Sequence, residues 1–261
     1  MLAIVAAGVY LVRKAMHPGA PETSPTVTPP APSTSAPARA ASTIQHPITQ
    51  ASSGPAPATT AALPALVDSD ANVRDALAAL VSGGDLHALL VPSQIISRVV
   101  ATVDALPRQG IGSTYILPLR TPKGALQTGQ ANGTTVIAAA NADRYAPYMT
   151  LLENVDPHAL VAWYKHDYPL FQQAYRELGY PHGYFNDRLI VAIDDMLAAP
   201  EVHEPIAVTR NGAHYVLVDP RLQALSNGQK LMVRLGPGNE AQFKAKLRMI
   251  RELLAGGQIA H

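Results

Sequence analysis

The sequence contains no cysteine. This absence excludes disulfides, thiol nucleophiles, thiolate-bound zinc and iron–sulfur clusters. The chain also lacks an excess of charge of one sign, because 20 Lys and Arg residues stand against 19 Asp and Glu residues. Nucleic-acid-binding domains normally carry a basic excess, so we expect no nucleic-acid partner.

The motifs of common active sites are missing as well. The chain has no P-loop, no dinucleotide fingerprint, no His-Glu-x-x-His and no Gly-x-Ser-x-Gly. Its histidines are scattered, without the helical spacing and third ligand of a metal site. We therefore expect no metal, no cofactor and no catalytic residue. What the chain does must be inferred from how it is organised.

The chain begins with a short apolar segment, residues 1–16. Its apolar part ends at Val12 and is followed by Arg13 and Lys14. A bilayer-spanning helix needs roughly 17–25 residues, and a signal peptide normally has basic residues before its apolar core. We interpret the segment as a membrane helix whose N-terminal part is missing from this sequence. A signal-peptide core and an apolar tail without a membrane role are the alternatives.

Residues 17–63 are rich in Pro, Ala, Ser and Thr and contain almost no large apolar side chains. Such a segment cannot offset the entropy cost of ordering its backbone, which predicts a disordered linker. Spacers of this composition favour a periplasmic domain, whereas Arg13 and Lys14 favour a cytoplasmic one by the positive-inside rule. We expect a single-pass inner-membrane protein with a periplasmic domain. An ordinary interdomain linker is the alternative.

Residues 64–257 have the apolar periodicity of one folded domain. Six stripes of apolar residues at helical spacing, bounded by capping residues, Pro or Gly, predict six helices. They cover about residues 70–82, 93–106, 147–154, 157–178, 184–198 and 239–255. Ser69 or Asp70 is expected to cap the first helix, and Asp156 the fourth.

Two Asn-Gly pairs predict hairpins. Asn132-Gly133 and Asn211-Gly212 each separate two runs with strand propensity, which is typical of a type I′ turn. The fold class is therefore α+β and predominantly α-helical, with about six helices and one or two small β-hairpins. The two hairpins are expected to share one sheet.

Four ordered blocks of this domain resemble a known family. They are Asp143–Tyr148, Phe171–Tyr180, Tyr184–Leu189 and Gly228–Gly236. Together they resemble the bacterial family called domain of unknown function 3014, over about residues 64–255. The resemblance implies a Gram-negative, envelope-associated protein with an N-terminal membrane segment and a Pro-rich spacer. It implies no activity, and no catalytic role is carried over from it.

Most aromatic residues lie in the helical block between the two hairpins. The aromatic stripe of the helix expected over 157–178 is assigned to the core. Tyr145, Tyr180 and Tyr184 fall instead at loops or helix ends, where we expect partial exposure. Tyrosine joins an apolar ring to a polar tip, which suits contacts with sugars and proteins.

Polar residues stand beside these tyrosines. Asn186, Asp187 and Arg188 lie at an expected helix start, where they either cap the helix and form a local ion pair or bind a ligand together with Tyr184. Arg144 is interpreted in the same way. The candidate ligand- or partner-binding residues are therefore Arg144, Tyr145, Tyr180, Tyr184, Asn186, Asp187 and Arg188.

A row of basic residues marks the last expected helix. Lys244, Arg248 and Arg251 have the spacing of one helix face, which we expect to point outward. Lys230 and Arg234 are expected nearby. Such a face is usually solvated; the alternative is a site for an anionic partner.

The acidic residues allow a second function. Glu177 with Asp187, Asp194 or Asp195 could form the acid pair of a glycosidase, provided the two carboxylates lie about 5–10 Å apart across a cleft. We expect a non-catalytic binding or scaffold module that contacts an envelope protein or peptidoglycan. The alternative is a cell-wall glycan hydrolase, or a degenerate relative of one, with Glu177 or Asp187 as the acid.

Overall fold

The structure is a computed structural model that describes residues 44–51, 62–81, 85–110, 116–203, 205–212 and 214–256. It is predominantly helical with two small antiparallel hairpins, which is the expected α+β class. The α-helices are α2 (Asp70–Leu80), α3 (Leu86–Leu89), α4 (Ile95–Ala105), α5 (Ala146–Asn154), α6 (Pro157–Glu177), α7 (Phe185–Leu197), α8 (Pro220–Gln223), α9 (Asn227–Leu235) and α10 (Pro237–Leu254). The 3-10 helices are η1 (Ile48–Gln50), η2 (Leu66–Asp68) and η4 (Ala139–Tyr145).

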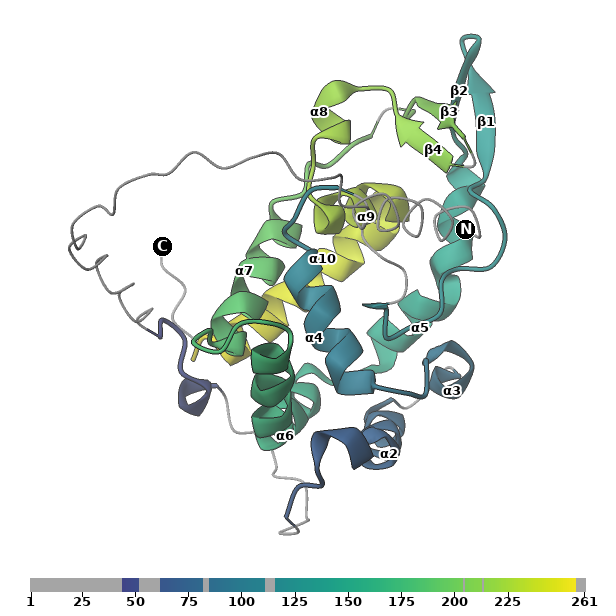
Figure 1. Ribbon diagram of the computed structural model, residues 1–261. Helices are drawn as coiled ribbons and strands as arrows, with labels where there is room; N and C mark the ends of the chain where they lie inside the picture. The colour runs from purple at the N-terminus through teal and green to yellow at the C-terminus, as the bar shows by residue number, and fades with distance from the viewer. Residues whose placement is uncertain are drawn as a thin grey trace, which may run out of the picture.

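Helices α4, α6, α7 and α10 form the centre of the domain, and both hairpins lie together at one end of it (Figure 1). The main core fills the space between these helices. The expected aromatic stripe of α6 is buried there, with Tyr164, Phe171 and Tyr175 each less than a tenth exposed. Tyr164 and Phe171 pack edge to face with ring centroids 5.0 Å apart. The assignment of this stripe to the core is confirmed.

Some helices are capped by the residue just before them, and α4 is capped by a residue of another helix. Asp156 caps α6 as expected, because its carboxylate accepts from the backbone N–H groups of His158 and Ala159. The expected cap of α2 is wrong. Ser69 makes no side-chain cap hydrogen bond, and Asp70 accepts from the N–H groups of Gln94 and Ile95, at 2.7 and 2.8 Å. Asp70 therefore caps the start of α4, not that of its own helix.

The first hairpin forms where the sequence predicts it. Strands β1 (Thr128–Ala131) and β2 (Thr134–Ile137) flank Asn132 and Gly133, which have φ values of +50° and +75°. Positive φ at both central residues is the requirement of a type I′ turn.

The second hairpin is shifted by one residue. Strands β3 (Val208–Asn211) and β4 (His214–Leu217) pair so that Asn211 lies opposite His214, which places Asn211 at the end of β3 and Gly212, with a φ of +62°, in the turn. The two hairpins are separate two-stranded sheets. A single antiparallel bridge between Val136 and Ala207 joins them.

Three helices are absent from the prediction, the short α3 and α8 and the buried α9. Helix α9 begins with a capping box, in which the Ser226 hydroxyl accepts from the Gln229 N–H while the Gln229 side chain accepts from the Ser226 N–H. Met232 of α9 is fully buried. It anchors a second core cluster between α5, α7 and α9, which includes Tyr145, Met149 and Met196.

The membrane prediction concerns residues that the structure does not describe. Within the described ranges, no helix is long and apolar enough to cross a bilayer. The apolar segment 1–16 lies outside those ranges, as does most of the expected linker 17–63. Residues 44–51 of that linker are described, and they lie against α6, α7 and the end of α10; Figure 1 draws them in purple.

Candidate functional site

The seven candidate residues do not form one site. They fall in three places, namely a loop near β1, a polar network at the end of α4, and the surface that holds residues 44–51. Five of the seven stand at or just before the start of α7, where the second and third places meet. The start of α7 is therefore the centre of the candidate site.

Arg144 and Tyr145 have structural contacts. The Arg144 guanidinium donates to the carbonyl oxygens of Pro122, Lys123 and Gly124, at 3.3, 3.2 and 2.8 Å. It thereby fixes the loop before β1. Tyr145 is 9% exposed and packs in the second core cluster, so the expectation that it is partly exposed is wrong. A polar tip at a helix end was not sufficient to predict exposure, because α9 covers the ring.

A surface hollow of about 500 Å³ adjoins this loop. It is lined by residues of both charges, including Asp85, Lys123, Asp143 and Arg144. Asp85 accepts from the Ala88 N–H at the start of α3. Since Arg144 holds the loop carbonyls, the Asp85 and Arg144 side chains both serve the local fold at this hollow.

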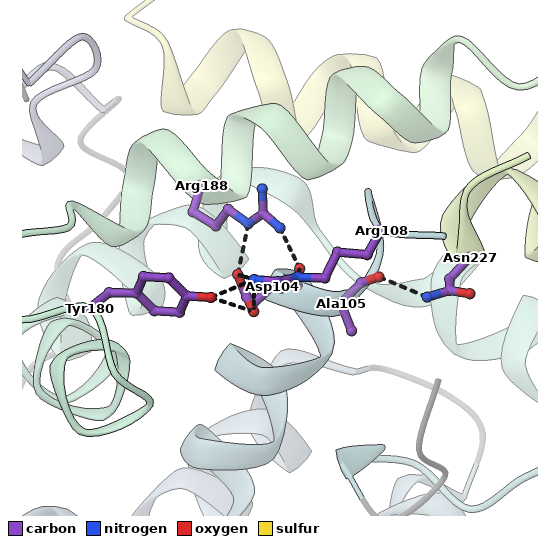
Figure 2. A network of polar contacts seen from close by, with 6 residues as sticks. All are labelled: Asp104, Ala105, Arg108, Tyr180, Arg188 and Asn227. Atoms are coloured by element: carbon purple, nitrogen blue, oxygen red, sulfur yellow. Dashed lines mark hydrogen bonds and ion pairs between the residues drawn. The ribbon is translucent and has the colours of Figure 1, made fainter. Parts of the chain in front are cut away.

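The second place is a network around Asp104, a residue of α4 that is 8% exposed (Figure 2). Its carboxylate forms ion pairs with Arg108, at 2.7 Å, and with Arg188 of α7, at 3.0 Å. Arg188 also donates to the Asp104 carbonyl oxygen. The Tyr180 hydroxyl donates to the carboxylate at 3.2 Å and accepts from Arg108. The hydrogen bond to Asp104 raises the pKa of Arg108.

The same network ties α9 to the end of α4. Asn227 Nδ2 donates to the Ala105 carbonyl oxygen at 3.0 Å, as Figure 2 shows, and the Asn227 N–H donates to the Arg108 carbonyl. These contacts satisfy carbonyl groups that a helix end leaves without an intrahelical partner. Tyr180 and Arg188 are thus held as parts of a joint between α4, α7 and α9.

The third place holds residues 45–48 by their backbone. Asp187 accepts from two consecutive N–H groups, those of Gln45 and His46, at 3.1 and 2.7 Å. Asn186 Nδ2 donates to the His46 carbonyl oxygen at 2.9 Å. The Tyr184 hydroxyl accepts from the N–H of residue 48 at 2.7 Å. Three of the seven candidate residues therefore bind one short peptide segment.

Asn186 is fully buried, and hydrogen bonds to two tyrosine hydroxyls fix its orientation. Its Oδ1 accepts from the Tyr164 hydroxyl at 3.2 Å, and its N–H donates to the Tyr168 hydroxyl at 3.4 Å. The core tyrosines and His46 enclose Asn186, so its polar atoms contact this segment and the core. Burial raises the pKa of Tyr164 and Tyr168, so both hydroxyls stay protonated and able to donate.

Two residues that the sequence did not single out complete this place. Gln172 Oε1 accepts from the Phe185 N–H and from the Tyr168 hydroxyl, while Nε2 donates to the Gly183 carbonyl, which positions the start of α7. Lys165 of α6 donates to the Ala51 carbonyl oxygen at 2.9 Å. Tyr168 and Gln172 are one helical turn apart, and this spacing could have predicted the hydrogen bond between their side chains.

The far end of the segment is held by packing. Ala51 is 3% exposed and belongs to the main core, with Ile48 packed against it. A Cβ atom added to Gly256, at the end of α10, would lie 3.0 Å from the Gln50 carbonyl oxygen. The backbone of the segment thus approaches α10 closely.

Residues 95–251 match a protein family described as Protein of unknown function (DUF3014). The chain belongs to this family. The resemblance inferred from the four sequence blocks is confirmed, although the match is shorter at the N-terminal side than the 64–255 expected. No curated protein and no solved structure matches the chain.

The family match includes the surface that holds residues 44–51 but not the segment itself. The DUF3014 range includes all four residues whose side chains hold the segment, namely Lys165, Tyr184, Asn186 and Asp187. It does not include residues 44–51. The binding surface is therefore part of the family domain, and the bound segment belongs to the region that precedes it.

The four acidic residues considered for a glycosidase in this DUF3014 domain all have hydrogen-bond or ion-pair partners. Asp187 holds two backbone N–H groups, and Asp194 pairs with Arg251. The Asp195 carboxylate accepts from the Ser226 hydroxyl at 2.6 Å, and Glu177 accepts from Gln173 at 3.0 Å. Within the described ranges, no three His, Asp or Glu side chains gather as a metal site would require.

The expected basic face of α10 is wrong for Lys244. Its side chain is buried, pairs with Glu240 at 2.8 Å, and donates to the Ala199 carbonyl oxygen at 2.7 Å. Lys230 is also buried. Arg251 is engaged by Asp194. Arg248 is exposed as expected, so the spacing placed this cation correctly and failed for Lys244 and Lys230, which pack inside the domain.

Proposed function

We propose that this protein is a non-catalytic binding or scaffold module of the cell envelope, tethered to the inner membrane through its N-terminal segment. Its domain is periplasmic and contacts an envelope protein or the cell wall through the surface at the start of α7. The observation that carries this proposal is the binding of a peptide segment by Tyr184, Asn186 and Asp187. These side chains bind a segment of the same chain that precedes the family match.

The tethered location rests on the sequence. The apolar start and the Pro-rich spacer are the arrangement of a membrane anchor followed by a linker that lets the domain search near the bilayer. The resemblance to envelope-associated proteins supports the same location. A tether suits a binding module, because it raises the effective concentration of the domain near its partners.

Binding is favoured over hydrolysis by the state of the acidic groups. A glycosidase needs two carboxylates that face each other across a cleft. Here Asp187 accepts two backbone N–H groups, and Asp194 and Asp195 are engaged by Arg251 and Ser226. Carboxylates with these partners hold neighbouring parts of the fold in place, and no observation favours the hydrolase.

The test is sedimentation of the purified full chain with intact peptidoglycan, together with photo-crosslinking in cells from a residue placed at position 182. Tyr184→Ala should abolish pelleting or the crosslink. Tyr215→Ala, in the remote second hairpin, is the matched control and should retain both. If neither readout detects a Tyr184-dependent contact, the proposal is wrong. Release of muropeptides by the wild-type chain would establish the hydrolase instead.

A further inference from the structure

The five hydrogen bonds described above between residues 44–51 and the family domain each join a side chain of the domain to a backbone group of the segment. Asp187 holds two N–H groups, Asn186 holds a carbonyl, Tyr184 holds an N–H and Lys165 holds a carbonyl. Backbone groups are the same in every peptide. The polar part of this site therefore recognises the course of an extended chain and not its side chains.

Side-chain selectivity comes from three positions. Pro47 stands between two bound N–H groups, those of His46 and Ile48, and its own φ is −59°. A proline fits there because it has no N–H to satisfy and is fixed near this φ. Ile48 and Ala51 pack into the main core. The site thus favours proline, then an apolar residue, then a small residue three positions later.

The site and its occupant belong to different parts of the chain. The four anchoring side chains lie within the family match, and the segment lies outside it. On the other side, residues 52–61 separate the segment from the rest of the domain. The binding side chains and the bound backbone thus come from stretches of the chain that are far apart in the sequence, which is the arrangement of a binding site occupied by an internal ligand.

We propose that the surface formed by Lys165, Tyr184, Asn186 and Asp187 is a peptide-binding site for a partner protein. It takes an extended segment in which proline is followed by an apolar residue. Residues 45–51 occupy it as an internal ligand until the partner's segment replaces them. This inference rests on the proposed binding function and names the chemical class of the partner.

The charge of the site agrees with this assignment. A carboxylate that accepts two consecutive backbone N–H groups makes short, charge-assisted hydrogen bonds. The side chains of Asp187 and Tyr184 remain half-buried, not sealed, at the start of α7. An incoming peptide can therefore reach Asp187 and Tyr184 first, whereas Asn186 and the core contacts of Ala51 become accessible as the internal segment leaves.

The internal ligand must weaken binding of any competing peptide. If residues 45–51 are docked about nine-tenths of the time, the site is available for the remaining tenth, and the apparent affinity for a competitor falls about tenfold. Short connections generally hold a tethered ligand at an effective concentration of about a millimolar, enough to reach this occupancy for a site of modest affinity.

The experiment measures fluorescence anisotropy of a labelled peptide with the sequence of residues 43–52, titrated with the full chain. Ile48→Asp in the protein should release the internal segment and leave the site intact, so that the peptide binds about tenfold more tightly than to the wild type. Adding Asp187→Asn to Ile48→Asp should remove this binding. Adding Asp75→Asn, at an exposed carboxylate of α2, should not.

A second variant guards against misfolding, since Ile48 contacts the core. Replacement of residues 44–51 by alternating Gly and Ser releases the site without placing a charge beside the core. Circular dichroism checks that both variants fold. Equal affinity of the peptide for the wild type and both folded variants, or no binding to either folded variant, would overturn the inference.

The two proposals fail in different readouts. If the released variants bind the peptide but no envelope contact depends on Tyr184, the envelope function is wrong and the peptide site stands. If the envelope contact depends on Tyr184 but the released variants do not bind the peptide, the peptide site is wrong and the envelope function stands.

Discussion

The Asp104 network gives the sharpest test of how this domain is held together. Asp104→Asn removes one negative charge with little change of shape and leaves two cations beside a neutral amide. The Arg108 side chain is 52% exposed, so solvent screens its ion pair with Asp104. Loss of that pair is expected to cost less than about 1 kcal/mol. The consequence depends mainly on Arg188, whose side chain is 21% exposed.

Breaking a fully buried pair by removing one partner costs about 3–5 kcal/mol. Arg188 keeps some solvent contact and its hydrogen bond to the Asp104 carbonyl oxygen, which places the expected cost at or below the lower end of this range. We expect Asp104→Asn to lower the free energy of unfolding by about 2–3 kcal/mol. Urea unfolding followed by circular dichroism measures it, with a fall in midpoint of about 1 M.

Two further variants test the reasoning itself. Asp75→Asn removes a carboxylate that pairs with Arg74 at 72% exposure and should change stability by less than about 0.5 kcal/mol. Adding Arg188→Met to Asp104→Asn removes the uncompensated cation and should restore at least about 1 kcal/mol. If Asp104→Asn unfolds within about 0.5 kcal/mol of the wild type, the network does not stabilise the joint between α4, α7 and α9.

Three other predictions concern packing, capping and pH. Gly183→Ala would place its Cβ 2.7 Å from a ring carbon of Tyr175, and urea unfolding should show a loss of about 1–3 kcal/mol. Asp70→Ala removes the cap of α4, and the same assay should show a loss of about 1–2 kcal/mol. Burial raises the pKa of Tyr164, so the folded state keeps a proton that the unfolded chain loses above about pH 10. Stability should therefore fall as the pH rises above about 10, and Tyr164→Phe should flatten this decline in unfolding curves recorded at increasing pH.

Each of these three has a matched control. Gly238→Ala meets no atom within 4 Å and should leave stability unchanged or slightly higher. Asp68→Ala removes a nearby exposed carboxylate and should cost little. Tyr215→Phe, in the second hairpin, should leave the alkaline decline as it is. A control that equals its test variant would contradict the mechanism given for that variant.

Local signals predicted the local elements. Asp156 followed by Pro157 marks the start of α6, and Asn132-Gly133 marks the first turn, because caps and tight turns depend on a few adjacent residues. Helix α9 was not predicted, because Gly228 and several polar residues interrupt the apolar periodicity of its sequence. The spacing of Ser226 and Gln229 did indicate its capping box.

The candidate site could be predicted only in part, because its partners are distant in the sequence. Tyr184 and Asp187 were identified from their position at a helix start, yet the groups that they bind are more than 130 residues earlier. No local pattern connects them, since residues 44–51 have the composition of a spacer. The burial of Asn186 and Lys244 depends on packing against Tyr164 and on the Ala199 carbonyl, which periodicity does not reveal.

The cap that Asp70 supplies to α4 decides where this domain can be cut. A fragment with the limits of the family match would begin at Ile95, whose N–H bonds to Asp70, and it would lose that cap together with Val73, which is 2% exposed. It would also lose Leu254, which is 1% exposed. The unit recognised by sequence comparison is thus smaller than the unit that folds, and expression of the shorter piece would yield a helix without its cap and a core open at two edges.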